Sequence, residues 1–525
     1  MQNPFLEDLK RVLDRENPNV SITENGAAGY ATTGHALLDL NFMLSSLRDA
    51  SEPDIWRLYL KAFNETPVAA LLWLFFIRDV REGCGERRVF RVILQHLAQE
   101  YVMPTLRLLK HVPEYGRWDD LWDVVTESTS PALRNELIRV VRTQLELDVE
   151  DMRQGCRVSL IAKWLPSANS SSKESRRKAI AFQKALGYSP RHYRRLLSAL
   201  RRHIDVVERR MSARRWNTIH YEAVPSRAML LYGDAFARHD PDGFKKYLSD
   251  VEKGEAKINA GALFPHDIVH AYMDDWWGVR KELDPKLEAQ WKALPDKVPA
   301  DQGTLVVIDG SGSMGSPIGG TNITAHDVAR SLGIYFSERL TGPYKDSFIT
   351  FSAHPQLIHF DDKLTLRDKL DLLNEYDECS NTDIEAVFNL VLKTAQENRL
   401  KQSDLPANIL VISDMEFDVG TTCYERGSSD YKAPSKRLFD QLAARYQAAG
   451  YQLPRLIFWN TSSRTGTIPV TSNDMGVALV SGFSPNIADM VMSGRMDPWD
   501  CLMDKLLSDR YKPILEEVRS VYEQR

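Results

Sequence analysis

Thr304-Leu-Val-Val-Ile-Asp-Gly-Ser-Gly-Ser-Met314 is the stretch that decides the fold of the second half of the chain. Its apolar run, Leu305 to Ile308, has the length of a buried strand and stops abruptly at Asp309. The Gly- and Ser-rich turn that follows falls at the carboxyl end of that strand, where parallel α/β sheets bind their ligands. Asp309, Ser311 and Ser313 place oxygen-bearing side chains on alternate residues of this turn. Because magnesium prefers such oxygens, the stretch predicts a metal site at the end of a strand.

Two later stretches carry polar side chains at the ends of predicted elements. Asn408-Ile-Leu-Val-Ile-Ser-Asp414 is a second buried-strand pattern that stops at a carboxylate, and Thr382 directly precedes a helical pattern. Each has a simpler alternative, because Thr382 and Glu385 also form a helix capping box, and an Asp can simply begin a turn. The order of all these residues on strand-end loops favours the metal. The expected ligands of one Mg²⁺, or another divalent cation, are Asp309, Ser311, Ser313, Thr382 and Asp414.

The spacing Asp-x-Ser-x-Ser at a strand end, with a later Thr and a later Asp, resembles the metal-ion-dependent adhesion site of von Willebrand factor A domains. That resemblance implies a Rossmann-like α/β domain with a metal ion at the carboxyl edge of its sheet. Two carboxylates balance one divalent cation, so the filled site would be near neutral. A protein partner that offers an Asp or Glu side chain could then occupy a remaining coordination position.

The rest of the second half also predicts an α/β domain. After Pro299, strand-like runs alternate with helical stretches, which indicates a mainly parallel sheet with crossover helices. The expected strands are 305–308, 348–351, 409–412, 456–459 and 477–480. The expected helices are 323–340, 364–373, 384–400 and 435–449, followed by C-terminal helices at 484–494 and 499–522.

In the first half of the chain, the apolar residues recur with a different period. From His35 to about Gln290, apolar residues recur at helical spacing, and convincing alternating strands are absent from the sequence. Successive short helices with short joints predict an α-solenoid of stacked pairs, such as HEAT-like repeats. The predicted fold class is therefore α plus α/β. The predicted domains are a helical-repeat domain at 1–298, a von Willebrand factor A domain at 299–482 and C-terminal helices at 483–525.

Composition sets broad limits on the class of protein. The chain has 525 residues with 43% hydrophobic and 26% charged residues, as in ordinary globular proteins. No apolar run reaches the ~18 residues of a membrane span, and the first residues do not resemble a signal peptide. Five scattered cysteines indicate neither a disulfide framework nor a zinc site. We therefore expect a cytoplasmic monomer without a membrane partner.

The net charge of -5 hides a strongly basic segment. Residues 153–215 hold 17 Lys and Arg against three acidic residues, a local net charge of +14. Pro190 can open a helix in which apolar residues such as Tyr193 and Leu197 share one face and arginines lie opposite. A solvated helix face usually mixes both signs of charge, so this one favours binding to a phosphate backbone. The candidate RNA-binding residues are Arg176, Arg177, Lys178, Lys184, Arg191, Arg194, Arg195, Arg201, Arg202 and Arg209.

Four stretches together resemble a known family. They are Phe76-Ile-Arg-Asp-Val-Arg-Glu-Gly-Cys-Gly-Glu-Arg87, Tyr115-Gly-Arg-Trp-Asp-Asp-Leu121, Ala162-Lys-Trp-Leu-Pro-Ser167 and the Asp309 turn. In this order they resemble the Ro autoantigen family, in which a TROVE module of helices precedes a von Willebrand factor A domain. They are more similar still to a related family of unassigned function in phages, large viruses and plants. The Ro resemblance implies that the helices close into a ring and that structured or misfolded small RNA binds its basic surface.

Three functions remain open from the sequence. The leading hypothesis is a non-enzymatic RNA-binding scaffold, which forms a ribonucleoprotein and uses a Mg²⁺-dependent domain to dock a partner. The alternative is a protein-interaction adaptor, for example with an AAA+ ATPase, whose metal site binds a partner carboxylate and which binds no RNA. A hydrolase ranks third, because a bound cation can activate water but the spacing places no general base beside it.

Overall fold

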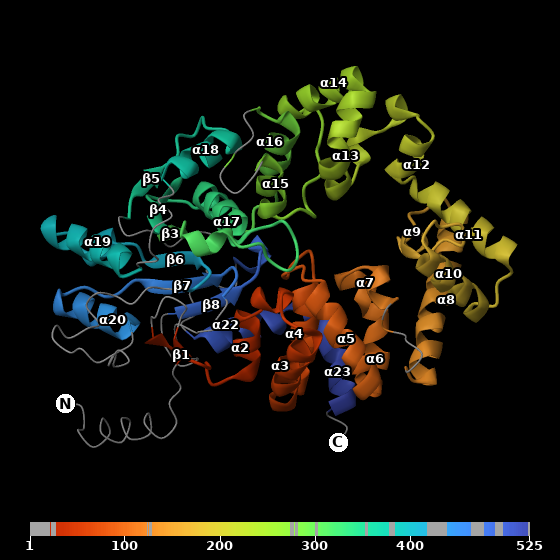
Figure 1. Ribbon diagram of the computed structural model, residues 1–525, viewed down its shortest axis with the longest axis horizontal. Coiled ribbons are helices and arrows are strands. Elements are labelled where there is room, and N and C mark those ends of the chain that lie inside the picture. The colour runs from red at the N-terminus through yellow and green to blue at the C-terminus, as the bar shows by residue number, and fades with distance from the viewer. Residues whose placement is uncertain are drawn as a thin grey trace. The chain divides into compact units, whose positions relative to one another are not determined.

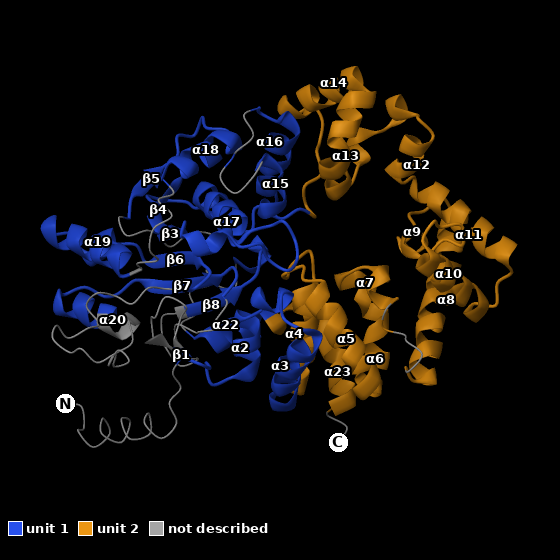
Figure 2. Ribbon diagram, viewed as in Figure 1, with its two compact units in different colours: residues 1–66, 263–505 blue, residues 67–262, 506–525 orange. Residues whose placement is uncertain are grey.

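A computed structural model of the chain describes residues 21–22, 28–122, 124, 129–273, 278, 282–299, 303–351, 355–376, 384–416, 438–463, 477–488 and 497–522. The chain forms two compact units (Figures 1 and 2). Unit 1 comprises residues 1–66 and 263–505, and unit 2 comprises residues 67–262 and 506–525. The units therefore divide the chain at other places than the predicted domain boundaries, 298/299 and 482/483.

Unit 1 is built on a six-stranded sheet. Its strands are β3 (Thr304–Asp309), β4 (Ser347–Phe351), β5 (Leu357–His359), β6 (Asn408–Ser413), β7 (Arg455–Asn460) and β8 (Val477–Ser481). Figure 1 shows them in the order β5-β4-β3-β6-β7-β8. All neighbouring pairs are parallel except β4 and β5, which are antiparallel. The order reverses between β3 and β6, and such a switch point is where open α/β sheets bind ligands.

Helices cover both faces of this sheet (Figure 1). They are α17 (Ala325–Arg339), α18 (Leu366–Tyr376), α19 (Ile384–Glu397) and α20 (Leu438–Ala448). Apolar residues of α19 and α20 share one core cluster with alternate residues of β3, β4, β6 and β7. On the other face, α17 approaches so closely that a Cβ on Gly333 would lie 2.1 Å from Ile308 Cδ1. Gly333 therefore sets the spacing between α17 and β3.

Segments from both sides of the predicted boundary complete unit 1. They are α2 (Ala36–Phe42), η1 (Ser46–Arg48), α3 (Glu52–Glu65), α15 (Pro265–Tyr272), α16 (Pro285–Lys292) and the two-stranded pair β1 (Ser21–Ile22) and β2 (Ala28–Gly29). Ser45 N donates to Ser481 Oγ (3.0 Å), which joins the N-terminal segment to the end of β8. Glu288 of α16 accepts from the backbone N–H of Leu366 (2.9 Å) and thereby caps α18. These contacts join the segment at Ser45 and helix α16 to the elements of the sheet.

Unit 2 is helical among its described residues. Its longer helices are α4 (Pro67–Arg78), α5 (Arg88–Glu100), α8 (Pro131–Arg153), α10 (Lys173–Ala185), α11 (Pro190–Ile204), α13 (Ser226–His239), α14 (Pro241–Glu252) and α23 (Lys512–Tyr522). Its shorter helices are α6 (Val102–Leu108), α7 (Val112–Tyr115), α9 (Ile161–Trp164) and α12 (Val207–Ser212). Helices that follow each other pack together, such as α4 with α5, α5 with α6 and α13 with α14.

The C-terminal helices do not form one piece. Residues 499–522, predicted as helical, form α22 (Pro498–Leu506), η9 (Asp509–Tyr511) and α23. Most of α22 belongs to unit 1, whereas α23 packs on α4 and α6 in unit 2. The two helices therefore stabilise different units. Within the described residues, no helix is both long and apolar enough to cross a membrane.

Candidate metal site and basic helix

The turn after β3 is ordered by its own polar groups. Asp309, the last residue of β3, is fully buried, and its Oδ1 accepts a hydrogen bond from Ser311 N at 2.9 Å. The hydroxyls of Ser311 and Ser313 lie 3.0 Å apart. The turn therefore holds a carboxylate and two hydroxyls close together.

The end of β6 brings a second carboxylate to the same edge. Ile308 lies opposite Ile412 in the parallel pairing of β3 and β6, so the residues that follow each strand are neighbours. Asp414 is buried there, and its Oδ1 accepts from Glu416 N at 3.2 Å. The switch point of the sheet thus carries two buried acids on adjacent strands.

Ser413 braces this arrangement and was not among the predicted site residues. Its hydroxyl donates to Asp309 Oδ2 at 2.5 Å and accepts from Met415 N at 3.0 Å. The side chain therefore fixes the Asp309 carboxylate from the neighbouring strand. The sequence signal was a Ser directly before the strand-end Asp414, inside an otherwise apolar run.

The electrostatics of Asp309 are unusual for a carboxylate. Burial and the negative charge of Asp414 raise the pKa of Asp309 from 3.8 to about 7, although hydrogen bonds from Ser413 and Ser311 oppose this. Two buried acids side by side disfavour each other's charged form. A divalent cation between them would remove that penalty, because it balances two negative charges.

The donor set fits magnesium by type. Asp309, Ser311, Ser313 and Asp414 are brought to one sheet edge, while Thr382 lies outside the described residues. Among the described residues, no group of three or more His, Cys, Asp or Glu side chains is placed to hold a metal. Serine hydroxyls would therefore have to share the coordination, and hard oxygens of this kind are what Mg²⁺ accepts.

A buried polar network lies behind this edge and was also not predicted. Ser463 Oγ donates to Glu416 Oε1 at 3.2 Å, and Ser463 N donates to Asn460 Oδ1 at 2.8 Å. Asn460 Nδ2 in turn donates to the carbonyl of Phe42 at 2.8 Å. The N-terminal segment therefore supports the same end of the sheet that carries the acids.

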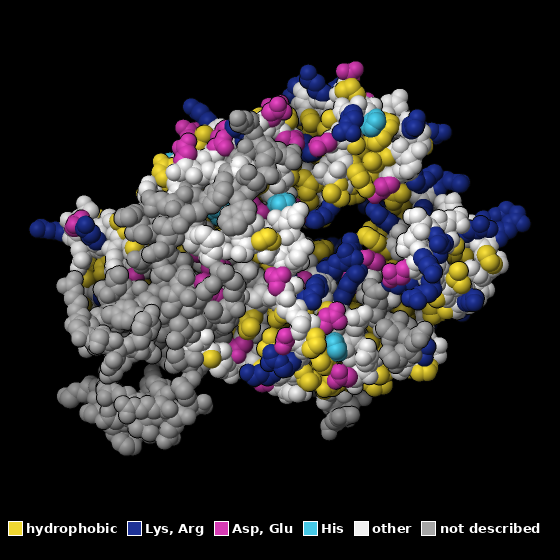
Figure 3. All heavy atoms as spheres, viewed as in Figure 1, with side chains coloured by type: hydrophobic (Ala, Val, Ile, Leu, Met, Phe, Trp, Pro, Cys, Tyr) yellow, Lys and Arg dark blue, Asp and Glu magenta, His cyan; other side chains and the backbone are white. Residues whose placement is uncertain are grey.

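The basic segment of unit 2 forms α10, α11 and α12. Arg176, Arg177, Lys178 and Lys184 lie on α10, while Arg191, Arg194, Arg195, Arg201 and Arg202 lie on α11. Arg209 lies on α12 and not on α11, because Asp205 takes a left-handed conformation (φ 51°) and ends α11. Figure 3 shows Lys and Arg side chains gathered over the region of α11 and α12.

The three acids of this segment are already paired. Glu174 pairs with Lys178 (3.0 Å), Asp205 pairs with Arg210 (2.6 Å) and Glu208 approaches Lys163 (4.0 Å). By contrast, Arg191, Arg195 and Arg202 are exposed, and none of the described carboxylates forms an ion pair with them. The outward face of α11 therefore keeps its positive charge.

Arg201 has a different role from the other arginines of α11. Its Nε donates to the carbonyl of Ala162, and its Nη2 donates to that of Leu165, both at 2.7 Å. Ala162 lies in α9 and Leu165 directly follows it, and carbonyls at a helix end lack helical partners of their own. Burial lowers the pKa of Arg201, and the side chain is held against unit 2 rather than projecting freely.

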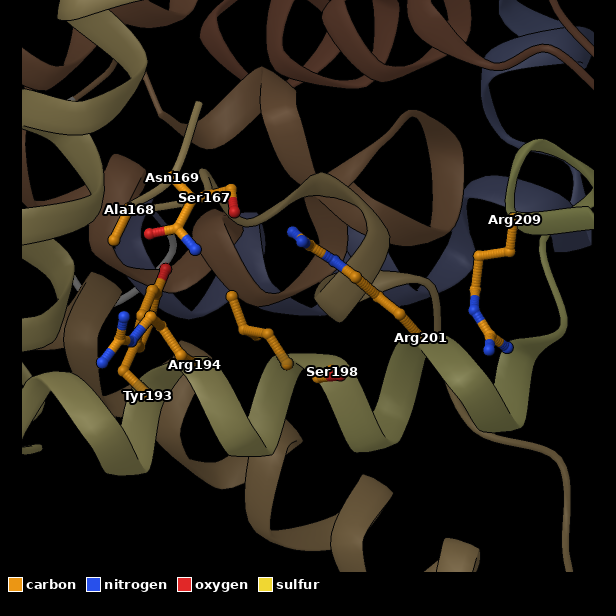
Figure 4. Close-up of a pocket in the computed structure, with 9 residues that line it drawn as sticks. Ser167, Ala168, Asn169, Tyr193, Arg194, Ser198, Arg201 and Arg209 are labelled. Carbon is orange, nitrogen blue, oxygen red and sulfur yellow. The ribbon is translucent and has the colours of Figure 1, made fainter. Parts of the chain in front are cut away.

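A pocket of about 230 Å³ lies between α11 and the loop after α9 (Figure 4). In Figure 4, Arg201 extends from α11 toward Ser167 and Asn169 on that loop. The pocket is lined by Ser167, Ala168, Asn169, Tyr193, Arg194, Leu197, Ser198, Arg201 and Arg209. Three of the candidate RNA-binding residues, Arg194, Arg201 and Arg209, therefore share one concave site.

The stretches that carry the family resemblance have structural roles in unit 2. Arg78 and Asp120, from the first and second stretch, form a buried ion pair at 2.7 Å. Arg87 of the first stretch also pairs with Asp119 of the second at 2.5 Å. The third stretch, 162–167, supplies the carbonyls that Arg201 binds. The resemblance therefore rests largely on residues that hold the helices together.

Comparisons with known proteins give matches to families of unknown function. Residues 303–505 match a domain of unknown function, DUF7788, and residues 172–305 match another, DUF2828. The chain is also similar to the uncharacterized protein L728 of Acanthamoeba polyphaga mimivirus. The two are 29% identical over 526 residues, which cover 93% of this chain and 87% of that protein. This viral relative agrees with the expected relationship to viral proteins. Neither family description names a Ro module or a von Willebrand factor A domain.

Each of the two matched regions contains one of the two candidate sites. The turn at Asp309 and the end of β6 fall in the DUF7788 region, whereas α10, α11 and α12 fall in the DUF2828 region. The regions meet at residues 303–305, close to the boundary predicted from the sequence. The similarity therefore changes where the sequence period changes, although the compact units divide elsewhere.

Proposed function

We propose that the protein is a non-enzymatic RNA-binding scaffold that resembles the Ro autoantigen. Structured or misfolded small RNA would lie along the basic face of α10, α11 and α12. The observation that carries the proposal is the exposure of Arg191, Arg195 and Arg202 without an ion pair to any described residue. Cations that are not neutralised by the protein are available to phosphates.

Unit 1 would act as a von Willebrand factor A domain with an adhesion-type metal site. Asp309, Ser311, Ser313, Thr382 and Asp414 would hold Mg²⁺. The strand order and the two buried acids at its switch point support this. When bound, the ion would offer an open position to the carboxylate of a partner protein. The protein's own part would be to hold the carboxylates in place, through Ser413 and the turn at Ser311.

The Ro-like proposal extends to the helices of unit 2. The packing of consecutive helices, such as α4 with α5, α5 with α6, α8 with α9 and α13 with α14, supports a HEAT-like solenoid. Closure of such helices into a ring would follow from the resemblance to Ro.

An adaptor without RNA is the second candidate function. The feature that favours it is the pair of buried acids, since the penalty at Asp309 would be relieved by a cation that can also bind a partner carboxylate. Such an adaptor could serve an AAA+ ATPase. An adaptor of this kind does not require the exposed arginines of α11. A measurement of RNA binding therefore distinguishes the two candidate functions.

The test is charge reversal on α11. In the triple variant Arg191→Glu, Arg195→Glu, Arg202→Glu, the apolar face with Tyr193 and Leu197 is untouched, so the fold should persist. We expect RNA affinity to be lost. Loss of three phosphate contacts should also reduce the slope of log K against log salt by about 2 to 3, at roughly 0.7 to 0.9 per contact.

A matched control reverses three exposed lysines elsewhere in unit 2. Lys245, Lys246 and Lys253 lie on or directly after α14, and changing all three to Glu alters the net charge equally. If the control weakens RNA binding as much as the α11 variant, only overall charge matters. Unchanged affinity in a folded α11 variant would refute the proposed surface, and failure of the wild type to bind RNA would favour the adaptor.

A further inference from the structure

The pocket beside α11 has a lining suited to an anion. It contains three arginines, two serines and an asparagine, and none of its lining residues is acidic. None of the described carboxylates forms an ion pair with Arg194, Arg201 or Arg209. Asp205 is attracted to Arg209 only over a longer distance and is itself paired with Arg210 at 2.6 Å. The positive charge of the pocket is therefore not cancelled by its surroundings.

Arg201 gives this pocket a fixed cation. Two of its N–H groups are bound to the carbonyls of Ala162 and Leu165, which leaves three donors of the guanidinium. The bound carbonyls are neutral, so they position the side chain without removing its charge. A cation held in place by the protein loses little freedom when an anion binds.

The size of the pocket and its neutral polar side chains limit the kinds of ligand that it can bind. A volume of about 230 Å³ lies below the ~300 Å³ at which pockets for drug-sized molecules begin. Ser167, Asn169 and Ser198 add neutral hydrogen-bond donors to the lining of the pocket. A terminal phosphate has three strong acceptor oxygens and nearly two negative charges, as in phosphoserine. A phosphodiester within a strand has a single charge and continues on both sides, which suits a groove better.

We propose that this pocket binds the terminal phosphate of an RNA strand, an assignment that rests on the RNA-binding function proposed above. The exposed arginines Arg191, Arg195 and Arg202 on the same helix favour RNA over a phosphorylated peptide, because they extend the positive surface well beyond one phosphate. The pocket would thus hold the strand end, while the outer face of α11 contacts the phosphates that follow.

The test compares RNA strands of one sequence that carry a 5′-phosphate, a 3′-phosphate or only hydroxyl ends. We expect the full-length protein to bind the strand with a phosphate at one of its ends on the order of tenfold tighter than the strand with only hydroxyl ends. A hydrogen bond to a charged group is worth about a tenfold change in affinity or more. Inorganic phosphate alone should compete only weakly, because it lacks the contacts of the outer arginines.

Two variants change the pocket without altering its supports. Arg209 and Ser198 are exposed, and their side chains make no hydrogen bond with the described residues. Arg209→Ala and Ser198→Glu should each abolish the preference for the phosphorylated end. The matched control is Arg195→Ala, which removes one charge from the same basic surface outside the pocket. It should weaken all the RNA strands equally and keep the preference.

Several results would overturn the assignment. If the wild type bound all strands equally, the pocket would not be a site for a terminal phosphate, but the proposed RNA-binding surface would still stand. If the wild type bound none of the strands, both the pocket assignment and the RNA-binding proposal would be refuted. If Arg195→Ala abolished the preference as fully as Arg209→Ala, general charge would explain it. Competition by a phosphoserine peptide as strong as that of the phosphorylated RNA would identify a peptide pocket instead.

Discussion

Replacing Asp309 by Asn tests whether the carboxyl edge of the sheet is built for a cation. Because the pKa of Asp309 is about 7 in the fold and 3.8 in its ordinary state, the folded protein binds more protons than the unfolded chain between these values. Stability must therefore fall as pH rises above 3.8, and the loss is complete above about pH 7. This direction is opposite to that of a salt-bridged Asp. Asn cannot ionise, so the variant should lack this loss.

The magnitude follows from the size of the pKa shift. The rise of the Asp309 pKa from 3.8 to about 7 corresponds to about 4 kcal/mol, since a tenfold change in the proton-binding constant is worth about 1.4 kcal/mol. In the variant, the introduced amide would meet the Ser413 hydroxyl, and the altered hydrogen bond should cost about 1 kcal/mol. Above pH 7, without a divalent cation, Asp309→Asn should thus be more stable than the wild type by about 3 kcal/mol. Below pH 4 it should be less stable by about 1 kcal/mol.

Magnesium should reverse this order at high pH. A ligand that binds only the folded state stabilises it by about 4.1 kcal/mol at a thousand times its dissociation constant, which exceeds the difference of about 3 kcal/mol. The wild type should gain this stability, whereas Asp309→Asn should gain little, because it has lost a charged ligand. Asp500→Asn is the control, since Asp500 is an exposed acid on α22, on a different element from the predicted site.

The assay is urea unfolding at about pH 4 and about pH 8, each with EDTA or with Mg²⁺, for the wild type and both variants. Trp459 is buried in β7, so tryptophan fluorescence responds when the sheet unfolds. Calorimetry with magnesium, manganese and calcium measures the binding directly. If Asp309→Asn is destabilised equally at both pH values and Mg²⁺ stabilises neither protein, the acids are only turn residues and the metal site does not exist.

Three further substitutions test the packing within the units by thermal and urea unfolding. Gly333→Ala should destabilise unit 1 by about 1 to 3 kcal/mol, because the added Cβ meets Ile308 Cδ1, and an unchanged midpoint would show that α17 can shift away from β3. Arg510→Ala should cost on the order of 3 to 5 kcal/mol, because it leaves the buried Asp79 without its ion pair at 2.7 Å. Lys110→Ala, which breaks a more exposed pair with Glu517, should cost less than about 1 kcal/mol, and equal losses would contradict the role of burial.

The sequence predicted the sheet well because buried parallel strands read as continuous apolar runs. The strands β3, β4, β6, β7 and β8 begin and end within one residue of the expected ranges. β5 was missed because it has only three residues and lies at the sheet edge, where Leu357 is 66% exposed. The break between α11 and α12 was also missed, because periodicity does not reveal that Asp205 takes a left-handed conformation.

The candidate sites were predictable in residue type but not in contacts. The order of Asp309, Ser311, Ser313 and Asp414 was visible, because each follows a recognisable strand. Arg201 was counted with the outer arginines, although at 100° per residue it falls about 80° from Tyr193, on the flank of the apolar face. That position already separated it from Arg191, Arg195 and Arg202. Its actual partners, the carbonyls of Ala162 and Leu165, depend on tertiary packing and have no local signal in the sequence.

The division into units has a consequence for how the two proposed functions can be separated. A cut at residue 298 would remove α2, α15 and α16 from the sheet that they complete, and would leave Asn460 without the carbonyl of Phe42. The same cut would take α23, with the buried Ile514 and Val518, away from α4 and α6. Both fragments would expose apolar surface and buried polar groups, although the sequence period changes near that point. Point substitutions on α11 and at Asp309, in the full chain, are therefore the sound way to assign RNA binding and cation binding to their separate sites.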